Sequence, residues 1–311
     1  MARHVVTGGA GFIGSHIVET LAGRGDQVLV LDNLSTGKPE NLTHIAGDVE
    51  LREVDLATCD SLAGHIGGAH TVFHQAAVPS VPYSLSDPVG SHAANVNATL
   101  NLLVACRDAG VGRVVYASSC ALYGDRAELP SREDMRASPL SPYGAQKYFG
   151  EVYMRIFQRN YGLETVSLRY FNVFGPRQDA GSPYSGVIAR FIPAVLRGER
   201  PVIYGDGSQS RDFIFVSNVV EANLRAAEAD SVAGEVFNVG MGEGITVNET
   251  LEEIRRITGS RLEASYEPAR AGDILHSRAD AASARRRLGW HPAASFRDGL
   301  RLTVDWYRNT L

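Results

Sequence analysis

Short apolar runs alternate with longer amphipathic runs along the first two-thirds of the chain. Runs rich in β-branched residues predict buried strands at 4–8, 27–32, 71–76, 113–118 and 165–171. The stretches between them have the spacing of amphipathic helices, and several end at glycine, a common helix C-terminal signal. Such alternation predicts an α/β fold with a doubly wound, mostly parallel sheet.

Beyond residue 174 the alternation becomes irregular. Segment 175–186 is predicted to be a loop, and 237–240 to be one more strand of the main sheet. The chain would therefore leave the first domain and return to it, with both domains packed around a shared cleft. The larger domain would comprise residues 1–174 and about 213–240, and the smaller domain about 175–212 and 241–311.

Composition narrows the classes of function. The chain has a net charge of −5, whereas proteins that bind nucleic acids or anionic membranes typically have an excess of basic residues. Cys59, Cys106 and Cys120 form no CxxC pair, which argues against a zinc site or a disulfide framework. We read no secretory signal at the N-terminus and no apolar run of membrane-spanning length. We expect a cytoplasmic protein without a metal.

A glycine-rich segment follows the first predicted strand directly. Gly8, Gly11 and Gly14 have the spacing G-x-x-G-x-x-G where the first helix begins. Glycines allow a tight turn and close approach of the backbone, and a helix N-terminus offers free N–H groups to a pyrophosphate. The segment predicts a dinucleotide site. The alternative is a turn with a structural role only.

An acidic residue stands at the second strand of this unit. Asp32 ends that strand, 18 positions after Gly14, where a carboxylate binds the adenosine ribose hydroxyls. It would repel a 2′-phosphate, and Asn33 follows it instead of an arginine, so the pattern favours NAD over NADP. Asp55 and Leu56 could contact the adenine ring, although a solvated loop explains Asp55 equally well.

Three polar residues form a candidate catalytic set. Ser119 follows the fourth predicted strand, and Tyr143 and Lys147 are four residues apart, which places them on one face of a helix. A phenol has a pKa of about 10, and a nearby ammonium favours its ionised form. In isolation these residues would be a strand-end hydroxyl and an exposed aromatic–cation pair. Combined with the glycine segment, they indicate an acid–base site beside a dinucleotide.

The complete set of motifs resembles the extended short-chain dehydrogenase/reductase family, and within it the UDP-hexose 4-epimerases. The resemblance covers nearly the whole chain and implies a Rossmann-type sheet with a smaller α/β C-terminal substrate domain. The motifs that carry it are TGGAGFIG (7–14), LDN (31–33), HQAA (74–77), SSCALYG (118–124), SPYGAQK (141–147), LRYFNVFGPRQ (168–178), GDGSQSRDF (205–213) and RAGD (270–273).

The resemblance implies a reaction through transient oxidation. Tyr143 would take the proton of the sugar 4-hydroxyl while Ser119 holds its oxygen and Lys147 holds the nicotinamide ribose. Hydride transfer to NAD would give a 4-keto sugar, which rotates and receives the hydride on its other face. Related 4,6-dehydratases have acids directly after the serine position. Cys120 and Ala121 stand here, which argues against dehydration.

The resemblance also assigns two sets of binding residues. The NAD set is Gly8, Gly11, Phe12, Ile13, Gly14, Asp32, Asn33, Ser35, Thr36, Gly37, Asp55, Leu56, Gln75, Ala76, Ala77, Tyr143, Lys147 and Phe171. The substrate set is Ser119, Asn172, Gln178, Val187, Ile188, Val202, Tyr204, Arg211, Arg270, Asp273 and Ser277. Arginines suit a diphosphate because their guanidinium groups bind two oxygens at once. Val202 and Ile188 could equally be plain core residues.

One position bears on the choice of sugar. Ser277 is small where enzymes restricted to glucose and galactose have a bulky tyrosine, so it leaves room for a 2-acetamido group. Gln178 and the loop after it also resemble the branch that acts on N-acetylated sugars. Pro79, Cys120 and Ala121 depart from that branch. A dual substrate range, covering UDP-N-acetylhexosamines and plain UDP-hexoses, is consistent with both observations.

Alternatives remain open at this stage. A UDP-glucuronate 4-epimerase or a 4-keto-sugar reductase would share most of the motifs, and a sensor protein on this fold would have lost the tyrosine or the lysine. The family commonly forms homodimers through two helices, here expected within 97–109 and 143–158.

Overall fold

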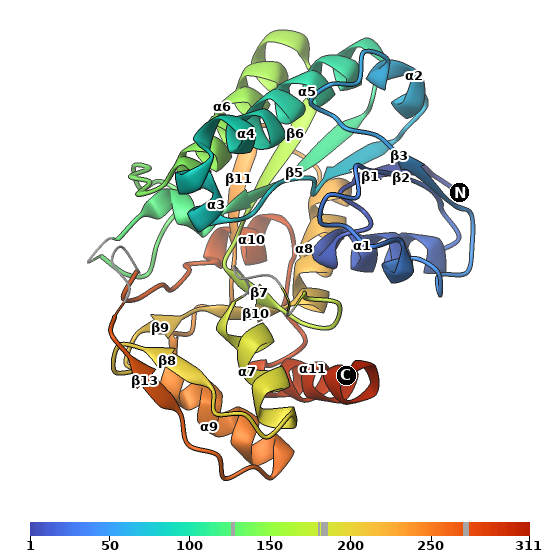
Figure 1. Ribbon diagram of the computed structural model, residues 1–311. Coiled ribbons are helices and arrows are strands. Elements are labelled where there is room, and N and C mark those ends of the chain that lie inside the picture. Colours follow the sequence, from blue (N-terminus) through green and yellow to red (C-terminus); the bar gives the residue numbers. More distant parts are fainter. Residues whose placement is uncertain (126–127, 180, 182–185, 270–273) are drawn as a thin grey trace.

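A seven-stranded parallel sheet forms the centre of the computed structural model, which describes residues 1–125, 128–179, 181, 186–269 and 274–311 (Figure 1). The strand order is β11-β6-β5-β4-β1-β2-β3. The strands are β1 (Arg3–Thr7), β2 (Gln27–Asp32), β3 (Val49–Glu53), β4 (Thr71–His74), β5 (Arg113–Ser119), β6 (Glu164–Tyr170) and β11 (Glu235–Val239). The predicted doubly wound α/β sheet is confirmed, and each of the six strands predicted begins and ends within two residues of its predicted bounds.

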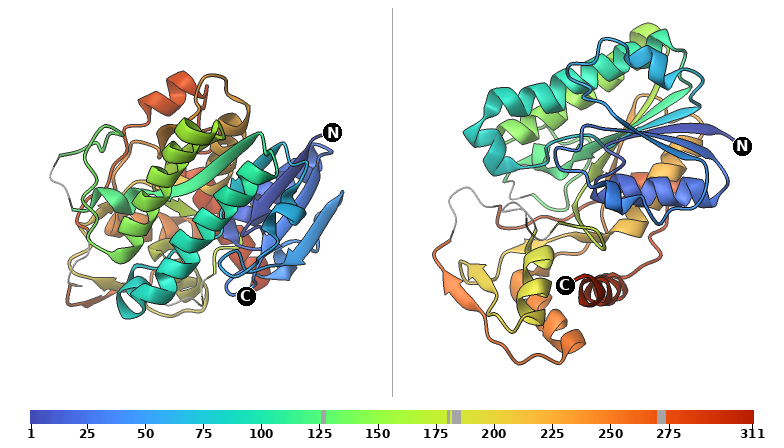
Figure 2. Two further views of the ribbon diagram at one scale, coloured as in Figure 1. Left: turned by 90° about the horizontal axis from the view of Figure 1, so that it is seen from above. Right: turned by 45° about the vertical axis from the view of Figure 1, so that its right-hand side comes forward.

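Alternating side chains explain why both faces of the sheet are covered. Val5 and Leu29 face one layer of helices while their neighbours Val6 and Val30 face the other, and all four are buried. The first layer contains α2 (Leu62–Ile66), α5 (Ala98–Asp108) and α6 (Pro142–Tyr161). The second contains α1 (Phe12–Gly23), α8 (Val216–Glu228) and α10 (Ala282–Arg287). Figure 2 shows the two layers on opposite sides of the sheet.

The order of the strands reverses at β1. The chain runs outward from β1 through β2 to β3, and then resumes on the other side of β1 with β4. In a doubly wound sheet, ligands bind at the carboxyl ends of the two strands that flank such a reversal. The segments that follow β1 and β4 therefore lie where the sequence predicted a dinucleotide.

A smaller group of elements lies below the sheet in Figure 1. Its apolar residues form a separate core, with aromatic side chains such as Phe174 and Phe213 at its centre. Its helices are α7 (Val187–Leu196), α9 (Val247–Thr258) and α11 (Phe296–Thr310), and its paired strands are β7 (Asn172–Phe174) with β10 (Phe213–Phe215), β8 (Val202–Tyr204) with β13 (Ser265–Glu267), and β9 (Ser210–Arg211) with β12 (Ile245–Thr246).

One part of the C-terminal region packs differently from the prediction. Residues 241–311 were all expected in the smaller domain, but α10 and Trp290 pack into the core beside the large sheet. Trp290 is fully buried, and its indole N–H donates to the carbonyl of Asn218 at 2.9 Å. A large aromatic side chain that reaches across to α8 makes this segment part of the larger core.

The helix that carries Tyr143 and Lys147 begins as the sequence predicts. Ser141 caps α6, since its hydroxyl accepts a hydrogen bond from the N–H of Gly144 at 3.2 Å, and Pro142 occupies the first helical position. The remaining short helices are α3 (Val81–Ser86), α4 (Pro88–His92), the π-helical turn η2 (Ala93–Asn97) and the 3-10 turns η1 (Pro39–Asn41) and η3 (Cys120–Tyr123). Among the described residues, no helix is both long and apolar enough to cross a bilayer.

Candidate active site

The glycine segment forms a cradle at the carboxyl end of β1. Gly8 has φ +67°, and a Cβ there would lie 2.6 Å from the backbone nitrogen of Ala76. A Cβ on Gly14 would collide with the carbonyl oxygen of Gly8. Gly11 stands at the N-cap of α1 and offers no capping side chain, so the first N–H groups of this helix stay open to a ligand. These features fit a bound pyrophosphate.

Asp32 is held against this cradle by backbone N–H groups. Its carboxylate accepts hydrogen bonds from Ala10 at 3.0 Å and from Leu34 at 2.9 Å. A Cβ on Gly37 would lie 2.7 Å from both carboxylate oxygens, so the loop after β2 must pass close to Asp32. The carboxylate is thereby fixed at the end of β2, as the ribose-binding role requires.

The remaining residues of the expected NAD set surround this edge of the sheet. Asn33 donates to the carboxylate of Asp55 at 3.1 Å, which brings Asp55 beside the end of β2. Leu56 is buried in the sheet core, and Phe171 packs beside Tyr123. Phe12, Ile13, Ala76 and Ala77 are half-buried, while Ser35 and Thr36 are exposed.

The side chain of Gln75, a residue of the expected NAD set, forms hydrogen bonds within the protein. Its amide nitrogen donates to the hydroxyl of Tyr170 and to Asn223, both at 3.1 Å. Asn223 is itself fully buried on α8. The Gln75 side chain therefore ties the end of β4 to β6 and α8, while its backbone N–H donates to the carbonyl of Thr7 at 3.0 Å.

Ser119 and Tyr143 are brought together by β5 and the first turn of α6. Ser119 ends β5, and its hydroxyl accepts from the N–H of Ala121 at 3.2 Å. Burial raises the pKa of Tyr143 to about 12, and a side-chain hydrogen bond with Ser119 opposes that shift. Burial thus favours the neutral phenol, and the interaction with Ser119 favours the ionised form.

Lys147 lies one turn further along α6 and is 4 % exposed. Its Nζ donates to the carbonyl of Ala117 at 2.7 Å and lies 5.1 Å from the centre of the Tyr116 ring. Burial lowers the pKa of Lys147 to about 7. In the described part of the chain no second acceptor bonds this ammonium, so two of its three donors can bind a ligand.

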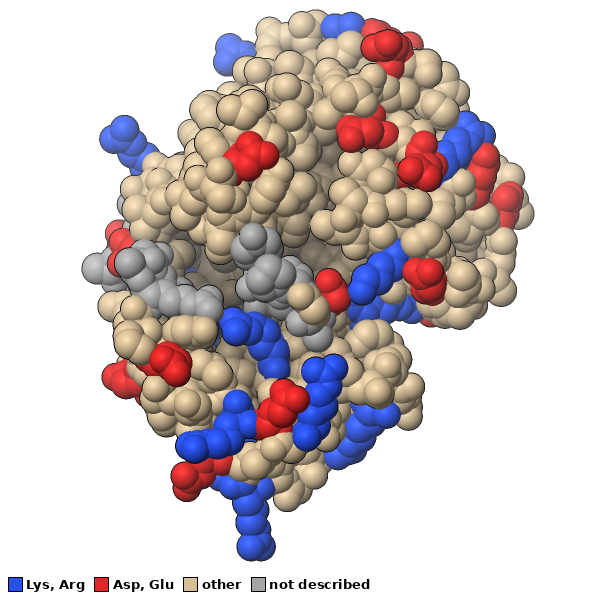
Figure 3. All heavy atoms as spheres, viewed as in Figure 1, with Lys and Arg blue, Asp and Glu red and all other residues tan. Residues whose placement is uncertain are grey.

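Asn172, Arg211 and Ser277 come together from three segments across the cleft from Ser119. The amide nitrogen of Asn172 lies 3.5 Å from the hydroxyl of Ser277, and Arg211 contacts the carbonyl of Leu275 at 3.2 Å. Ser277 and Cys120 line one small cavity. In Figure 3 this side of the molecule is hollowed between its upper and lower parts, with Lys and Arg side chains below the hollow.

The other expected substrate residues are placed less uniformly. Val202 is exposed at its strand, and Tyr204 lies 5.9 Å from the guanidinium of Arg190. Val187 is half-buried, whereas Ile188 is 1 % exposed and belongs to the core of the smaller domain. Gln178 donates to the carbonyl of Val173 at 3.2 Å. Arg270 and Asp273 lie outside the described residues.

Comparison with known proteins now identifies the family. Residues 4–240 match the NAD dependent epimerase/dehydratase family. The chain belongs to that family. The predicted resemblance to extended short-chain dehydrogenases/reductases of epimerase type is thereby confirmed, and the family is one of NAD-dependent enzymes.

Full-length relatives share both the sequence and the fold. A UDP-glucose 4-epimerase from Mycolicibacterium smegmatis is 40% identical over 313 residues, covering 99% of each chain. The structure of a UDP-N-acetylglucosamine 4-epimerase from Methanobrevibacter ruminantium in complex with UDP-N-acetylmuramic acid is 43% identical, with a TM-score of 0.96 over 100% of this chain and 99% of the other. A UDP-glucose 4-epimerase from Thermus thermophilus in complex with NAD is 41% identical, with a TM-score of 0.91 over 99% and 100%.

Two buried acidic residues beside this site were not predicted from the sequence. Asp212 follows Arg211 and collects backbone N–H groups from two other segments. Glu151 forms an ion pair with Arg169 beneath the Ser119 end of β5. A charged residue within a buried central strand, as Arg169 is in β6, was the available signal for the second group.

Replacing Gly8 by Ala should yield protein that purifies with little NAD. The added Cβ would meet the backbone of Ala76, and the left-handed conformation at Gly8 disfavours any other residue by roughly 1–2 kcal/mol. NAD released on denaturation can be measured per mole of protein. The control is Gly23→Ala, at the end of α1, because a Cβ on Gly23 would meet nothing within 4 Å. Equal NAD content in both variants would contradict the cradle.

Proposed function

We propose that this protein is an NAD-dependent UDP-hexose 4-epimerase that interconverts UDP-N-acetylglucosamine and UDP-N-acetylgalactosamine, and also UDP-glucose and UDP-galactose. The observation that carries the proposal is the placement of Tyr143 beside Ser119, with buried Lys147 one helical turn away, next to the glycine cradle. The names of the relatives support both the reaction and the two classes of sugar.

Each residue of the site has a distinct task in this reaction. Tyr143 takes the proton of the sugar 4-hydroxyl and later returns it, and Ser119 holds that oxygen in place. The ammonium of Lys147 holds the cofactor ribose and favours the ionised form of Tyr143 through its charge. The Gly8–Gly14 cradle and Asp32 would hold NAD, which when bound accepts the C4 hydride and gives it back.

The surroundings of Ser119 favour epimerisation over dehydration. A dehydratase needs an acid and a base at neighbouring carbons of the sugar. Burial raises the pKa of Cys120 to about 12, so its thiol stays protonated and cannot serve as a base at neutral pH. Ala121 has no acid–base group. The site therefore offers acid–base chemistry at one sugar hydroxyl, through Tyr143.

The cavity beside the catalytic set supports the acceptance of N-acetylated sugars. Ser277 and Cys120 share it with Tyr123, Phe171 and Leu129. Small side chains at the first two positions leave space for a substituent, and the apolar ones suit an acetyl methyl group. We propose that this cavity receives the 2-acetamido group.

Replacing Ser277 by Tyr should remove activity on the N-acetylated substrates selectively. We expect kcat/KM for UDP-N-acetylglucosamine to fall by at least about a hundredfold while that for UDP-glucose changes less than about fivefold, because a phenol would fill the cavity. Coupled assays with both substrates measure the ratio. Ser277→Ala is the control and should keep both activities. Equal loss on both sugars in Ser277→Tyr would count against the gate.

Three further features belong to the proposal. We place residues 1–171 and about 216–240, with α10, in an NAD domain, and the rest, including β7 and β10, in a UDP-sugar domain. We propose a homodimer through α5 and α6, since Val104, Phe149 and Ile156 are exposed there. We also propose that the protein works in the cytoplasm.

A direct assay tests the function. Purified protein is incubated with UDP-N-acetylglucosamine without added cofactor, and the products are separated by chromatography. We expect the galacto isomer to accumulate to equilibrium. The proposal fails if none of the four neutral UDP-hexoses is converted, with or without added NAD.

A further inference from the structure

Asp212 is a fully buried carboxylate at the substrate side of the cleft. Its Oδ1 accepts a hydrogen bond from the N–H of Met241 at 2.8 Å. Its Oδ2 accepts from Gly242 at 2.9 Å and from Ala279 at 2.8 Å. All three donors are backbone N–H groups, and they belong to two separate loops. The Asp212 side chain therefore joins both loops to the residue that precedes β10.

The backbone of Asp212 contacts two residues of the expected substrate set. Its carbonyl accepts from the N–H of Asn172 at 2.9 Å, and its N–H lies 3.4 Å from the hydroxyl of Ser277. Arg211 precedes it in the chain. Three segments that carry candidate substrate residues therefore meet at Asp212.

The segment that carries Ser277 depends on this meeting point for its position. Upstream of Ser277, the carbonyl of Leu275 accepts from the N–H of Ser210 at 2.9 Å, and the N–H of Ser277 donates to the carbonyl of Ser210 at 3.1 Å. Downstream, Ala279 donates to Asp212, between β9 and β10, while Arg278 and Asp280 pair with the backbone of Ser131 at 2.8 and 2.9 Å. The bond to Asp212 is the downstream contact that ties the segment to the side of Asn172 and Arg211.

We propose that Asp212 is a positioning residue for substrate recognition: its carboxylate holds the Ser277 segment against Asn172 and Arg211 and so sets the fit of the sugar. This inference rests on the proposed function. Asp212 itself touches no substrate, because its side chain has no exposed surface.

Asp212→Asn tests the inference with little change in volume. A carboxylate accepts through both oxygens, whereas an amide places an NH2 group against at least one of the three backbone donors. We expect KM for UDP-N-acetylglucosamine to rise about ten- to a hundredfold, the range for losing one hydrogen bond to a charged group. We expect a smaller rise for UDP-glucose, kcat within about threefold of wild type, and unchanged NAD content.

Arg113→Met is the matched control. Arg113 also collects three backbone groups, the carbonyls of Ala226, Ala227 and Ala229 at 2.8–3.0 Å, but at the opposite end of β5 from Ser119. The Arg113→Met variant should have a lower midpoint of urea unfolding but an unchanged KM for UDP-N-acetylglucosamine. A structural role alone would make the two variants behave alike.

The outcomes separate this inference from the proposed function. An unchanged KM in Asp212→Asn, or equal rises in both variants, overturns the inference while the wild-type activity stands. If wild type does not epimerise, the proposed function fails, and calorimetric binding of UDP decides: weaker binding by Asp212→Asn supports the positioning role, and equal or absent binding overturns it. If Asp212→Asn does not fold, Asp212→Glu replaces it, and a wild-type KM in that variant overturns the inference.

Discussion

Tyr143→Phe should lower kcat for epimerisation by at least about a thousandfold, within the range that a general acid–base group contributes. The change removes one oxygen atom, and with it the group that we propose as the base. UDP binding should stay within about threefold of wild type, because the residues that we propose to hold the uridine diphosphate, such as Arg211, belong to other segments. Steady-state kinetics and calorimetry measure the two effects.

The same helix supplies a control for that experiment. Tyr153 lies on α6 and packs into the sheet core, away from Ser119. Tyr153→Phe should keep wild-type turnover. Turnover retained in Tyr143→Phe would refute the role of Tyr143 as the base, whereas lost UDP binding in that variant would show that the substitution had disturbed the cleft.

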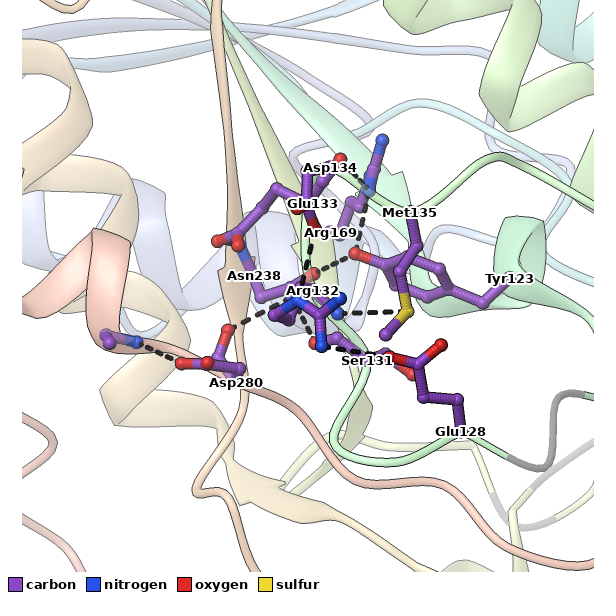
Figure 4. A network of polar contacts seen from close by, with 11 residues as sticks. Tyr123, Glu128, Ser131, Arg132, Glu133, Asp134, Met135, Arg169, Asn238 and Asp280 are labelled. Atoms are coloured by element: carbon purple, nitrogen blue, oxygen red, sulfur yellow. Dashed lines mark hydrogen bonds and ion pairs between the residues drawn. The ribbon is translucent and has the colours of Figure 1, made fainter.

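Arg169→Met should lower the free energy of unfolding by about 3–5 kcal/mol, the range for breaking a buried ion pair from one side. Arg169 and Glu151 are 3 % and 0 % exposed, and the guanidinium forms two bonds with the carboxylate, at 2.9 and 2.8 Å. The guanidinium also donates to the hydroxyl of Tyr123 at 2.7 Å (Figure 4). Removing Arg169 leaves the Glu151 charge buried without a cation. Urea unfolding followed by circular dichroism measures the loss.

An exposed ion pair provides the comparison. Arg24 and Glu228 lie 2.8 Å apart with both side chains largely in solvent, so Arg24→Met should change stability by less than about 1 kcal/mol. Combining Arg169→Met with Glu151→Leu should recover part of the loss, because the uncompensated charge is gone. Equal effects of Arg24→Met and Arg169→Met would show that burial of the pair has little energetic weight.

The local parts of this architecture could be predicted from the sequence because their causes are local. The strand at 27–32 has an unbroken apolar run at 28–31 followed by Asp32, and the structure has the same bounds. Ser141 and Pro142 are typical N-cap and first-turn residues, and α6 begins at Pro142. Gly8 and Gly14 could be assigned because a tight turn into a helix leaves little choice of residue.

The rest depends on partners that are distant in the chain. Asp212 lies in the motif GDGSQSRDF, but its contacts are with N–H groups 29 to 67 residues away, which the motif does not reveal. Trp290 could be recognised as a packing residue, but not as part of the larger core, because the choice between two cores is made by tertiary packing. The side-chain bonds of Gln75 with Tyr170 and Asn223 are equally non-local.

The return of α10 and Trp290 to the large core has a consequence for how this chain can be divided. The polypeptide passes from the sheet to the smaller group of elements and back, with β11 in between and α10 afterwards. The smaller group is therefore built from several separate segments of the chain, and the larger group is not continuous in sequence either. No single truncation releases either group with its core complete, and recombination could not exchange the smaller group as one contiguous segment.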